Sequence, residues 1–140
     1  MKRLYRSSLV AALIIFLGGN AAAADEGLVS ARQSLADYGL ARCLMAAWPE
    51  TSVIRDDIAA ASGALHHMGR GAHQIRQNED TLEVTHDPYQ VIDAFVRKAY
   101  AEHATLTKDE RENVLLGCLA VYHLDEYRQL VSAQDEFIDR

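Results

Sequence analysis

The chain has few cysteines, and it has none of the motifs on which catalysis and metal binding commonly depend. It has two cysteines, two prolines and one tryptophan in 140 residues, and it contains no HExxH, CxxC, GxSxG or phosphate-binding glycine loop. Zinc and copper sites need three or four converging ligands, whereas the six histidines are scattered and the adjacent His66 and His67 would diverge by about 100° on a helix. The sequence therefore favours a binding protein over an enzyme, with no metal and no cofactor. The alternative is an exported helical protein that binds a metal or a small ligand through the loop histidines His73 and His86.

Positive charge is scarce as well. Fourteen Lys and Arg residues stand against 20 Asp and Glu residues, which gives a net charge of −6. This balance argues against nucleic acid or an anionic membrane as partner and permits fast association with a basic protein. A second interpretation stays open, in which the acidic charge only keeps an exported protein soluble.

Long apolar runs are absent except near the start of the chain. Residues 9–17 are apolar, follow the basic Lys2, Arg3 and Arg6, and precede the small residues 22–24. The run is shorter than the roughly 20 residues that span a bilayer, so the pattern predicts a cleavable signal peptide at 1–24 and a mature exported domain at 25–140, without a membrane segment. A retained membrane anchor is the alternative. Loss of the three basic residues changes the net charge from −6 to −9.

The two cysteines, Cys43 and Cys118, both lie in the predicted mature domain and are 75 positions apart. An exported protein meets an oxidising environment, so a disulfide is expected, and closing so long a loop would contribute about 4 kcal/mol in the chain-entropy model. A free catalytic thiol is the alternative, although neither cysteine lies in a known nucleophile motif.

Helical periodicity occupies four stretches, which predict an all-α domain built as a compact bundle of about four helices. The first covers residues 28–48 and ends before Pro49. The second is expected to start at a cap on Thr51 or Ser52 and to end near Gly69. Its predicted buried positions are Ile54, Ile58, Ala61, Leu65 and Met68. Within it, the small residues 59–63 allow close helix packing or are simply a helix-favouring alanine run.

The other two helices have stronger start signals. Asp87 followed by Pro88 predicts a cap and a first helical residue, and the expected buried positions that follow are Ile92, Phe95, Val96, Ala99 and Tyr100. Thr107 and Glu110 have the spacing of a capping box for the last helix. That helix is apolar on all sides from 114 to 122 and is therefore expected to be enclosed as the core helix. It then becomes amphipathic as far as Val131.

Residues 69–87 have no sustained helical period, although residues 82–85 alternate and predict a short extended piece. Loops of this length inside a small domain are functional or disordered in most cases.

Two sequence blocks resemble a known family. The first is Tyr38-Gly-Leu-Ala-Arg-Cys-Leu44, and the second runs from Leu116-Gly-Cys-Leu-Ala-Val-Tyr-His through Leu-Asp-Glu-Tyr-Arg-Gln-Leu-Val131. Together they resemble the type VI secretion amidase immunity proteins of family four. The resemblance implies an all-helical periplasmic protein that forms a homodimer and neutralises a cognate peptidoglycan amidase effector, an enzyme with a Cys-His pair that cuts the stem peptide. It also implies that Cys43 and Cys118 join the first helix to the core helix.

Immunity proteins of this family block the effector cleft with a protruding loop and a helical surface. The segment 69–87 looks longer and more polar than the family's usual connection, so we hypothesise that it is the inserted element; a disordered surface loop is the alternative. Its predicted effector-binding residues are Arg70, His73, Arg76, Glu79 and Asp80. Tyr122 and His123 in the second block are assigned to packing, with His123 partly buried.

Overall fold

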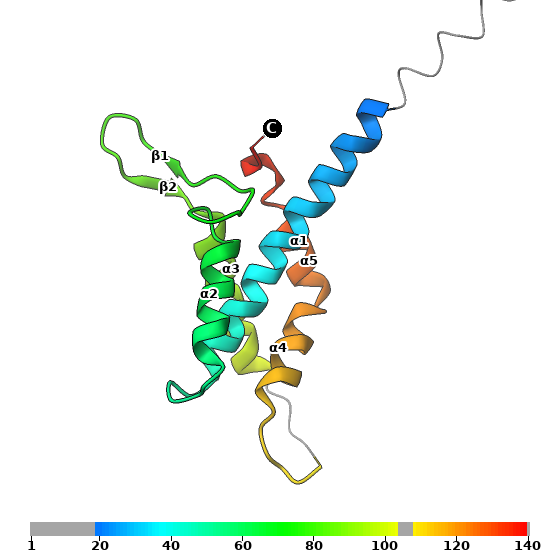
Figure 1. Ribbon diagram of the computed structural model, residues 1–140, viewed down its shortest axis with the longest axis vertical. Coiled ribbons are helices and arrows are strands. Elements are labelled where there is room, and N and C mark those ends of the chain that lie inside the picture. Colours follow the sequence, from blue (N-terminus) through cyan, green and yellow to red (C-terminus); the bar gives the residue numbers. More distant parts are fainter. Residues whose placement is uncertain (1–18, 104–107, 140) are drawn as a thin grey trace, which may run out of the picture.

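The computed structural model describes residues 19–103 and 108–139, apart from the side chains of 19–23. Helices account for most of this part of the chain, and a single small hairpin is the remaining regular element, so the all-α prediction is confirmed (Figure 1). The elements in chain order are α1 (Gly19–Ala47), α2 (Arg55–Leu65), β1 (Arg76–Gln77), β2 (Val84–His86), α3 (Pro88–Glu102), α4 (Val114–Tyr122), α5 (Asp125–Ser132) and the short 3-10 helix η1 (Asp135–Phe137).

Helix α1 is the element against which the bundle is built. It contacts α2, α3, α4 and α5, and its first turns extend beyond the other helices (Figure 1). The apolar run of the predicted signal peptide, residues 9–17, lies outside the described residues. Helix α1 itself crosses the predicted cleavage point after Ala24, and the first buried side chain in the described part of α1 is Ala31. Cleavage there would therefore remove no core side chain that the structure describes.

The core lies between α1, α3, α4 and α5. Leu35 on α1, Ile92 and Val96 on α3, Val121 on α4 and Tyr127 on α5 are all almost completely buried. The N-terminus of α3 forms as predicted, because Asp87 Oδ1 accepts hydrogen bonds from the amides of Tyr89 (2.9 Å) and Gln90 (3.2 Å). The predicted buried face of α3 is confirmed at Ile92, Val96 and Ala99, while Phe95 and Tyr100 are partly buried.

Gly39 permits the close approach of α1 to α3 and α5. A Cβ atom at this position would lie 2.0 Å from Tyr127 Oη and 2.6 Å from Ile92 Cγ2, both on buried side chains. The Tyr127 hydroxyl in turn donates a hydrogen bond to the carbonyl of Ala36 (2.8 Å), one turn away on α1. Gly63 in α2 is different, because no described atom outside its own stretch of helix lies within 4 Å of its Cβ position.

The two glycines therefore give a matched pair of predictions. Gly39→Ala is expected to lower the free energy of unfolding by about 2 to 3 kcal/mol, because a tightly packed core must shift to admit the methyl group. Gly63→Ala is expected to raise it by about 0.5 kcal/mol, because the helix gains intrinsic propensity without a clash. Urea unfolding followed by circular dichroism measures both, and equal effects of the two substitutions would contradict the packing described above.

The second helix differs from its prediction. Helix α2 starts at Arg55 behind Ile54, which makes no side-chain cap bond to a described residue, and Thr51 and Ser52 lie in the preceding turn. The helix ends at Leu65, and Met68 is 85% exposed. Of the small residues 59–63, Ser62 is buried, whereas Gly63 is exposed. The predicted buried stripe is therefore wrong at Ile54, Ala61 and Met68, which are exposed. Ile58 and Leu65 are partly buried, and Leu65 packs against the core.

The last predicted helix is two helices. Thr107 lies outside the described residues, and Glu110 has φ 59° and is not helical, so the predicted start is wrong. Asn113 is the cap instead, since its Oδ1 accepts a hydrogen bond from the amide of Leu116 (3.0 Å). The chain breaks at Leu124, which is extended, and the carbonyl of His123 accepts a hydrogen bond from Arg128 Nη1 (2.9 Å).

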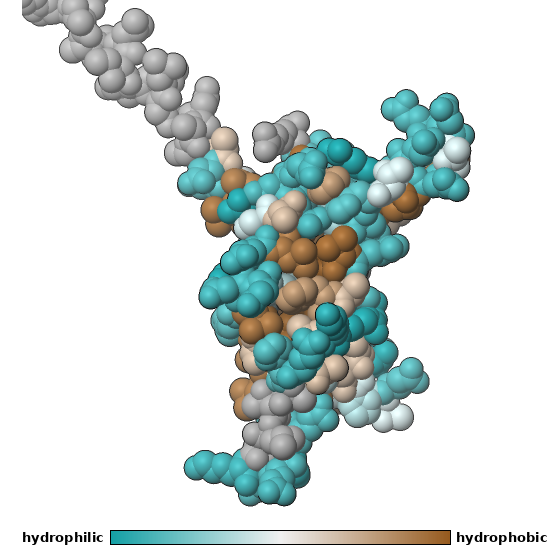
Figure 2. Space-filling view, turned by 180° about the vertical axis from the view of Figure 1, so that it is seen from behind, coloured by the Kyte–Doolittle hydropathy of each residue, from teal (hydrophilic) through white to brown (hydrophobic). Residues whose placement is uncertain are grey.

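Helix α4 is only partly enclosed. Gly117, Cys118 and Val121 face the core, whereas Leu115 and Leu116 are 46% and 47% exposed, which corrects the prediction of a helix buried on all sides. Figure 2 shows apolar side chains gathered over the middle of the face opposite to that of Figure 1, with mostly hydrophilic residues around them. Within residues 19–103 and 108–139, none of the helices has the length and apolar character that crossing a membrane requires.

Candidate binding surface

The segment 69–87 forms a β-hairpin that projects from the bundle (Figure 1). Strands β1 and β2 are antiparallel, with Arg76 opposite His86 and Gln77 opposite Val84 across an irregular register. The predicted extended piece at 82–85 is confirmed at its second half, where Val84–His86 forms β2. The loop is therefore an ordered protrusion in the structure.

The hairpin tip, residues 78–83, is held by its own hydrogen bonds. Asn78 Oδ1 accepts from the amides of Asp80 and Thr81, each at 2.9 Å, and the Asn78 carbonyl accepts from the amide of Leu82 (2.9 Å). Leu82 has φ 58°, a left-handed conformation that costs a non-glycine residue about 1 kcal/mol. Its side chain is 71% exposed, and the acidic residues Glu79, Asp80 and Glu83 of the same tip are exposed as well. The tip thus presents an apolar side chain within acidic surroundings.

Residues 134–139 hold the hairpin where it joins the bundle. The ring of Phe137 stacks on the His86 ring with centroids 3.8 Å apart, and the Arg76 guanidinium lies 4.6 Å from the Phe137 ring centroid. His86 Nε2 also hydrogen bonds to Gln134 Oε1 (2.8 Å). Asp135 is paired with Arg32, whose Nε donates at 2.9 Å, so η1 is fixed to α1 as well. The base of the protrusion is therefore linked to the bundle through residues 134–139.

Backbone pairing completes this attachment. His73 and Ile138 form an antiparallel bridge, the amide of Gln74 donates to the Phe137 carbonyl (2.7 Å), and the amide of Asp139 donates to the Ala72 carbonyl (3.1 Å). We call residues 72–76 together with 134–139 the hairpin base.

Helix α3 also contacts the hairpin base, through Tyr89. The Tyr89 hydroxyl donates to the carbonyl of His73 (3.1 Å), and burial raises the pKa of this hydroxyl above its ordinary value. The Tyr89 ring also packs edge-on against Tyr38 (centroids 5.0 Å apart) and lies 4.5 Å from the His66 ring. Gly71 is required at its position, because a Cβ atom there would lie 2.1 Å from the Tyr89 hydroxyl.

Four of the five predicted effector-binding residues are exposed. Glu79 and Asp80 are exposed at the hairpin tip, Arg76 is exposed on the hairpin base, and Arg70 is exposed in the turn after α2. His73 is a correction to the prediction, because its side chain is 1% exposed and belongs to the interior of the hairpin base. Its burial is a tertiary property, produced by Tyr89 and the C-terminal residues, which the local polar sequence did not indicate.

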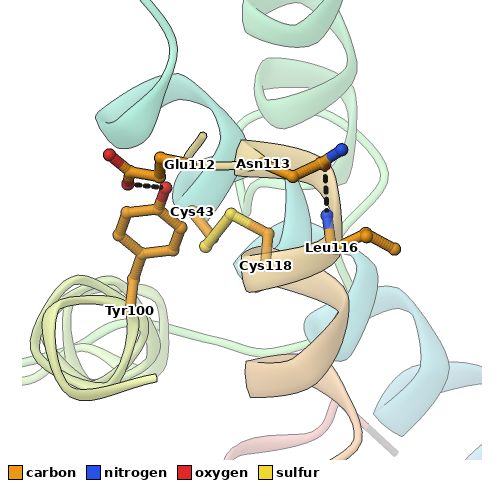
Figure 3. The surroundings of a disulfide bond; sticks show 6 residues. All are labelled: Cys43, Tyr100, Glu112, Asn113, Leu116 and Cys118. Atoms are coloured by element: carbon orange, nitrogen blue, oxygen red, sulfur yellow. Dashed lines mark hydrogen bonds between the residues drawn. A yellow bond between two sulfur atoms is a disulfide. The ribbon is translucent and has the colours of Figure 1, made fainter. Parts of the chain in front are cut away.

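The two cysteines are joined by a disulfide, as predicted, with a Cα–Cα distance of 5.8 Å. The bond links α1 to α4 and both cysteines are buried, so the alternative of a free catalytic thiol is wrong. Figure 3 shows the Tyr100 side chain reaching from α3 toward Glu112 beside this bond. The Tyr100 hydroxyl donates to the Glu112 carboxylate, and burial together with that carboxylate raises the pKa of Tyr100 to about 12. The Tyr100 ring lies over Gly117, where a Cβ would come within 2.7 Å.

Tyr122 and His123 have different environments. The Tyr122 hydroxyl donates to Asp37 (3.0 Å) and accepts from Gln33 Nε2 (2.7 Å), which agrees with a packing role. His123 is exposed at the end of α4, so its predicted partial burial is wrong; the chain turns there and carries the ring outward.

A groove of about 390 Å³ lies between α1 and the α4–α5 junction, a size at the lower end for small-molecule sites. Its two arginines, Arg32 and Arg128, are already paired with Asp135 and Asp125. The residues that line it are Val29, Arg32, Gln33, Ala36, Tyr122, His123, Tyr127, Arg128, Val131 and Ser132. In the described part of the chain, no group of three or more His, Cys, Asp or Glu residues is placed to hold a metal ion.

Comparisons with protein-family models, curated proteins and solved structures found no match for this chain. The family resemblance therefore depends on the two sequence blocks alone.

Sequence reasoning did not identify the C-terminal residues that hold the hairpin, namely Gln134, Phe137 and Ile138. One signal was present, because Phe137 and Ile138 are adjacent apolar residues in an otherwise polar tail. Their partners were not recognisable, since they lie more than 45 positions earlier in the chain.

Proposed function

We propose that this chain is a periplasmic immunity protein, which binds a cognate peptidoglycan amidase effector and occludes its active site with the hairpin. The observation that carries the proposal is an ordered protrusion anchored on a disulfide-linked helical bundle. An inhibitor that acts by steric exclusion needs a pre-organised shape and no reactive group, because order before binding lowers the entropic cost of association. The two sequence blocks that resemble family-four immunity proteins add support, since the disulfide joins one block to the other and Tyr122 of the second block bonds to Asp37 on α1.

The hairpin tip has a suitable composition for this role. It offers one exposed apolar side chain, Leu82, next to three carboxylates, so it fits a cleft that has an apolar floor and a basic rim. The negative charge of the predicted mature domain, −9, would speed encounter with a basic effector at low salt. A homodimer, as the resemblance implies, would present two such hairpins.

The test is peptidoglycan hydrolysis by the effector encoded beside this gene, measured with and without residues 25–140 in oxidised form. We expect stoichiometric inhibition and a complex that survives gel filtration, whose mass also reports whether the protein is a dimer. The association rate should fall at least about tenfold between 20 and 500 mM salt, because electrostatic steering is screened. The proposal would be refuted if a folded, oxidised sample neither bound nor inhibited the effector that the adjacent gene encodes.

The second candidate is a small-ligand-binding protein, and the groove between α1 and the α4–α5 junction is the feature that favours it. Calorimetric titration with zinc, copper and small organic acids distinguishes the two functions. Tight one-to-one binding of such a ligand, without effector binding, would favour the second candidate.

A further inference from the structure

His73 is a buried titratable side chain at a structural junction. Its ring is 1% exposed and meets the Tyr89 ring edge-on, with centroids 6.5 Å apart. Neither Nδ1 nor Nε2 has a hydrogen-bond partner among the residues that the structure describes. A neutral imidazole in this position leaves one N–H donor unsatisfied, and a protonated one leaves two donors and a charge.

The backbone of His73 is the point where the hairpin and the chain end meet. The antiparallel bridge to Ile138 passes through it, and the two adjoining hydrogen bonds, from Gln74 and Asp139, close the pairing on either side. The hairpin is connected to the C-terminal segment most directly here. A change in the charge of this ring therefore acts on the attachment itself.

The charged surroundings offer little compensation for a proton on the ring. Asp135 is the charged group that acts on His73, and its carboxylate is already paired with Arg32. Other titratable or charged groups on the elements around the hairpin base include Tyr89, which contacts the ring, and His66, Arg76, His86, Asp87, Glu136 and Asp139. Burial accordingly lowers the pKa of His73, and the attraction of Asp135 opposes this only in part.

We propose that His73 is a pH-sensitive latch: the neutral ring keeps the hairpin base closed, and protonation of the ring separates the hairpin from residues 134–139. The latch acts in the free protein, whether or not the hairpin binds an effector. The hairpin then has two states. In the closed state it is attached to residues 134–139, and in the open state it has lost this attachment.

The direction of the effect follows from proton linkage. The closed state has the lowered pKa and the open state an ordinary histidine pKa of about 6.5, so the open state binds more protons. Closure is therefore fully favoured above about pH 6.5 and weakens as the pH falls below that value. Between pH 7.5 and 5.5 the ratio of closed to open molecules should fall up to about tenfold.

Amide hydrogen exchange measured by NMR tests the latch. The amides of Gln74 and Asp139 donate across the hairpin base, so their protection factors, corrected for intrinsic rates, are expected to fall about tenfold from pH 7.5 to pH 5.5. In His73→Leu, a side chain of similar volume that does not titrate, this pH dependence should disappear. In His86→Gln, the matched variant of the histidine that stacks on Phe137 of the hairpin base, it should persist.

Three results would overturn the proposal. The first is a change smaller than twofold in the protection factors of the two amides between pH 7.5 and pH 5.5 in the native protein. The second is loss of the pH dependence in His86→Gln but not in His73→Leu. The third is exchange of Gln74 and Asp139 only together with the core amide of Val96, which would show that the hairpin base does not open separately. Where His73→Leu does not fold, the ring protons of His73 in the native protein decide: titration near pH 6.5 with both amides still protected would refute the latch.

Discussion

Replacing the hairpin tip, residues 78–83, by Asn-Gly is expected to lower affinity for the cognate effector at least about a hundredfold. The two new residues form the preferred turn between paired strands, and Gln77 and Val84 already face each other in the register. The change removes Leu82 and three carboxylates, and loss of a central anchor with its charged neighbours costs an interface about 3 kcal/mol or more. Calorimetry or surface plasmon resonance with the effector measures the effect.

This excision is sharper than a deletion of residues 74–80. Gln74 pairs with the chain end and Arg76 packs on Phe137, so their removal would also disturb the hairpin base. Leu82→Ala tests the apolar side chain by itself, and Val53→Ala is the matched control, since Val53 is an exposed aliphatic residue in the turn before α2. Unchanged inhibition by the tipless protein would mean that another surface contacts the effector.

Removing the disulfide with Cys43→Ala and Cys118→Ala is expected to lower the free energy of unfolding by about 4 kcal/mol. The bond closes a loop across 75 positions, and its loss restores that freedom to the unfolded chain. Such a loss is a large part of the 5 to 15 kcal/mol that stabilises a typical domain. Urea unfolding of the oxidised native protein and of the double variant gives the difference directly.

Reduced native protein is the control for this measurement and should unfold at nearly the same urea concentration as the double variant. A difference below about 1 kcal/mol between oxidised protein and variant would contradict the expected role of the bond. The hairpin and α4 lie at opposite ends of the molecule (Figure 1), so loss of the bond should leave the hairpin contacts in place while the bundle remains folded. The two predictions therefore test different parts of the structure.

Local sequence signals correctly predicted the helix ends that a capping residue or a proline determines. Helix α3 starts at the Asp87 cap and Pro88, and α1 ends before Pro49, because caps and prolines act on their immediate neighbours. The signals failed where two local patterns competed. Thr107 and Glu110 suggested a capping box, but Asn113 is the residue that caps α4.

The candidate site was predicted in outline only. The polar composition of residues 69–87 indicated an exposed element, and Glu79 and Asp80 do lie at its tip. The burial of His73 was not foreseeable, because it depends on Tyr89 and on the bridge to Ile138, 65 positions later. For the same reason, residues 134–139 were not recognised as the attachment of the hairpin.

The sequence by itself determined the helical class, the start of α3 and the presence of a long polar connection, since these follow from periodicity, capping and composition. It also made a bond between Cys43 and Cys118 the expected state of the two cysteines. Tertiary structure alone decided which apolar residues stay exposed, such as Leu115 and Leu116, and which polar ones are buried, such as His73. The physical reason is that burial depends on which distant segments cover a residue, and that information is spread over the whole chain.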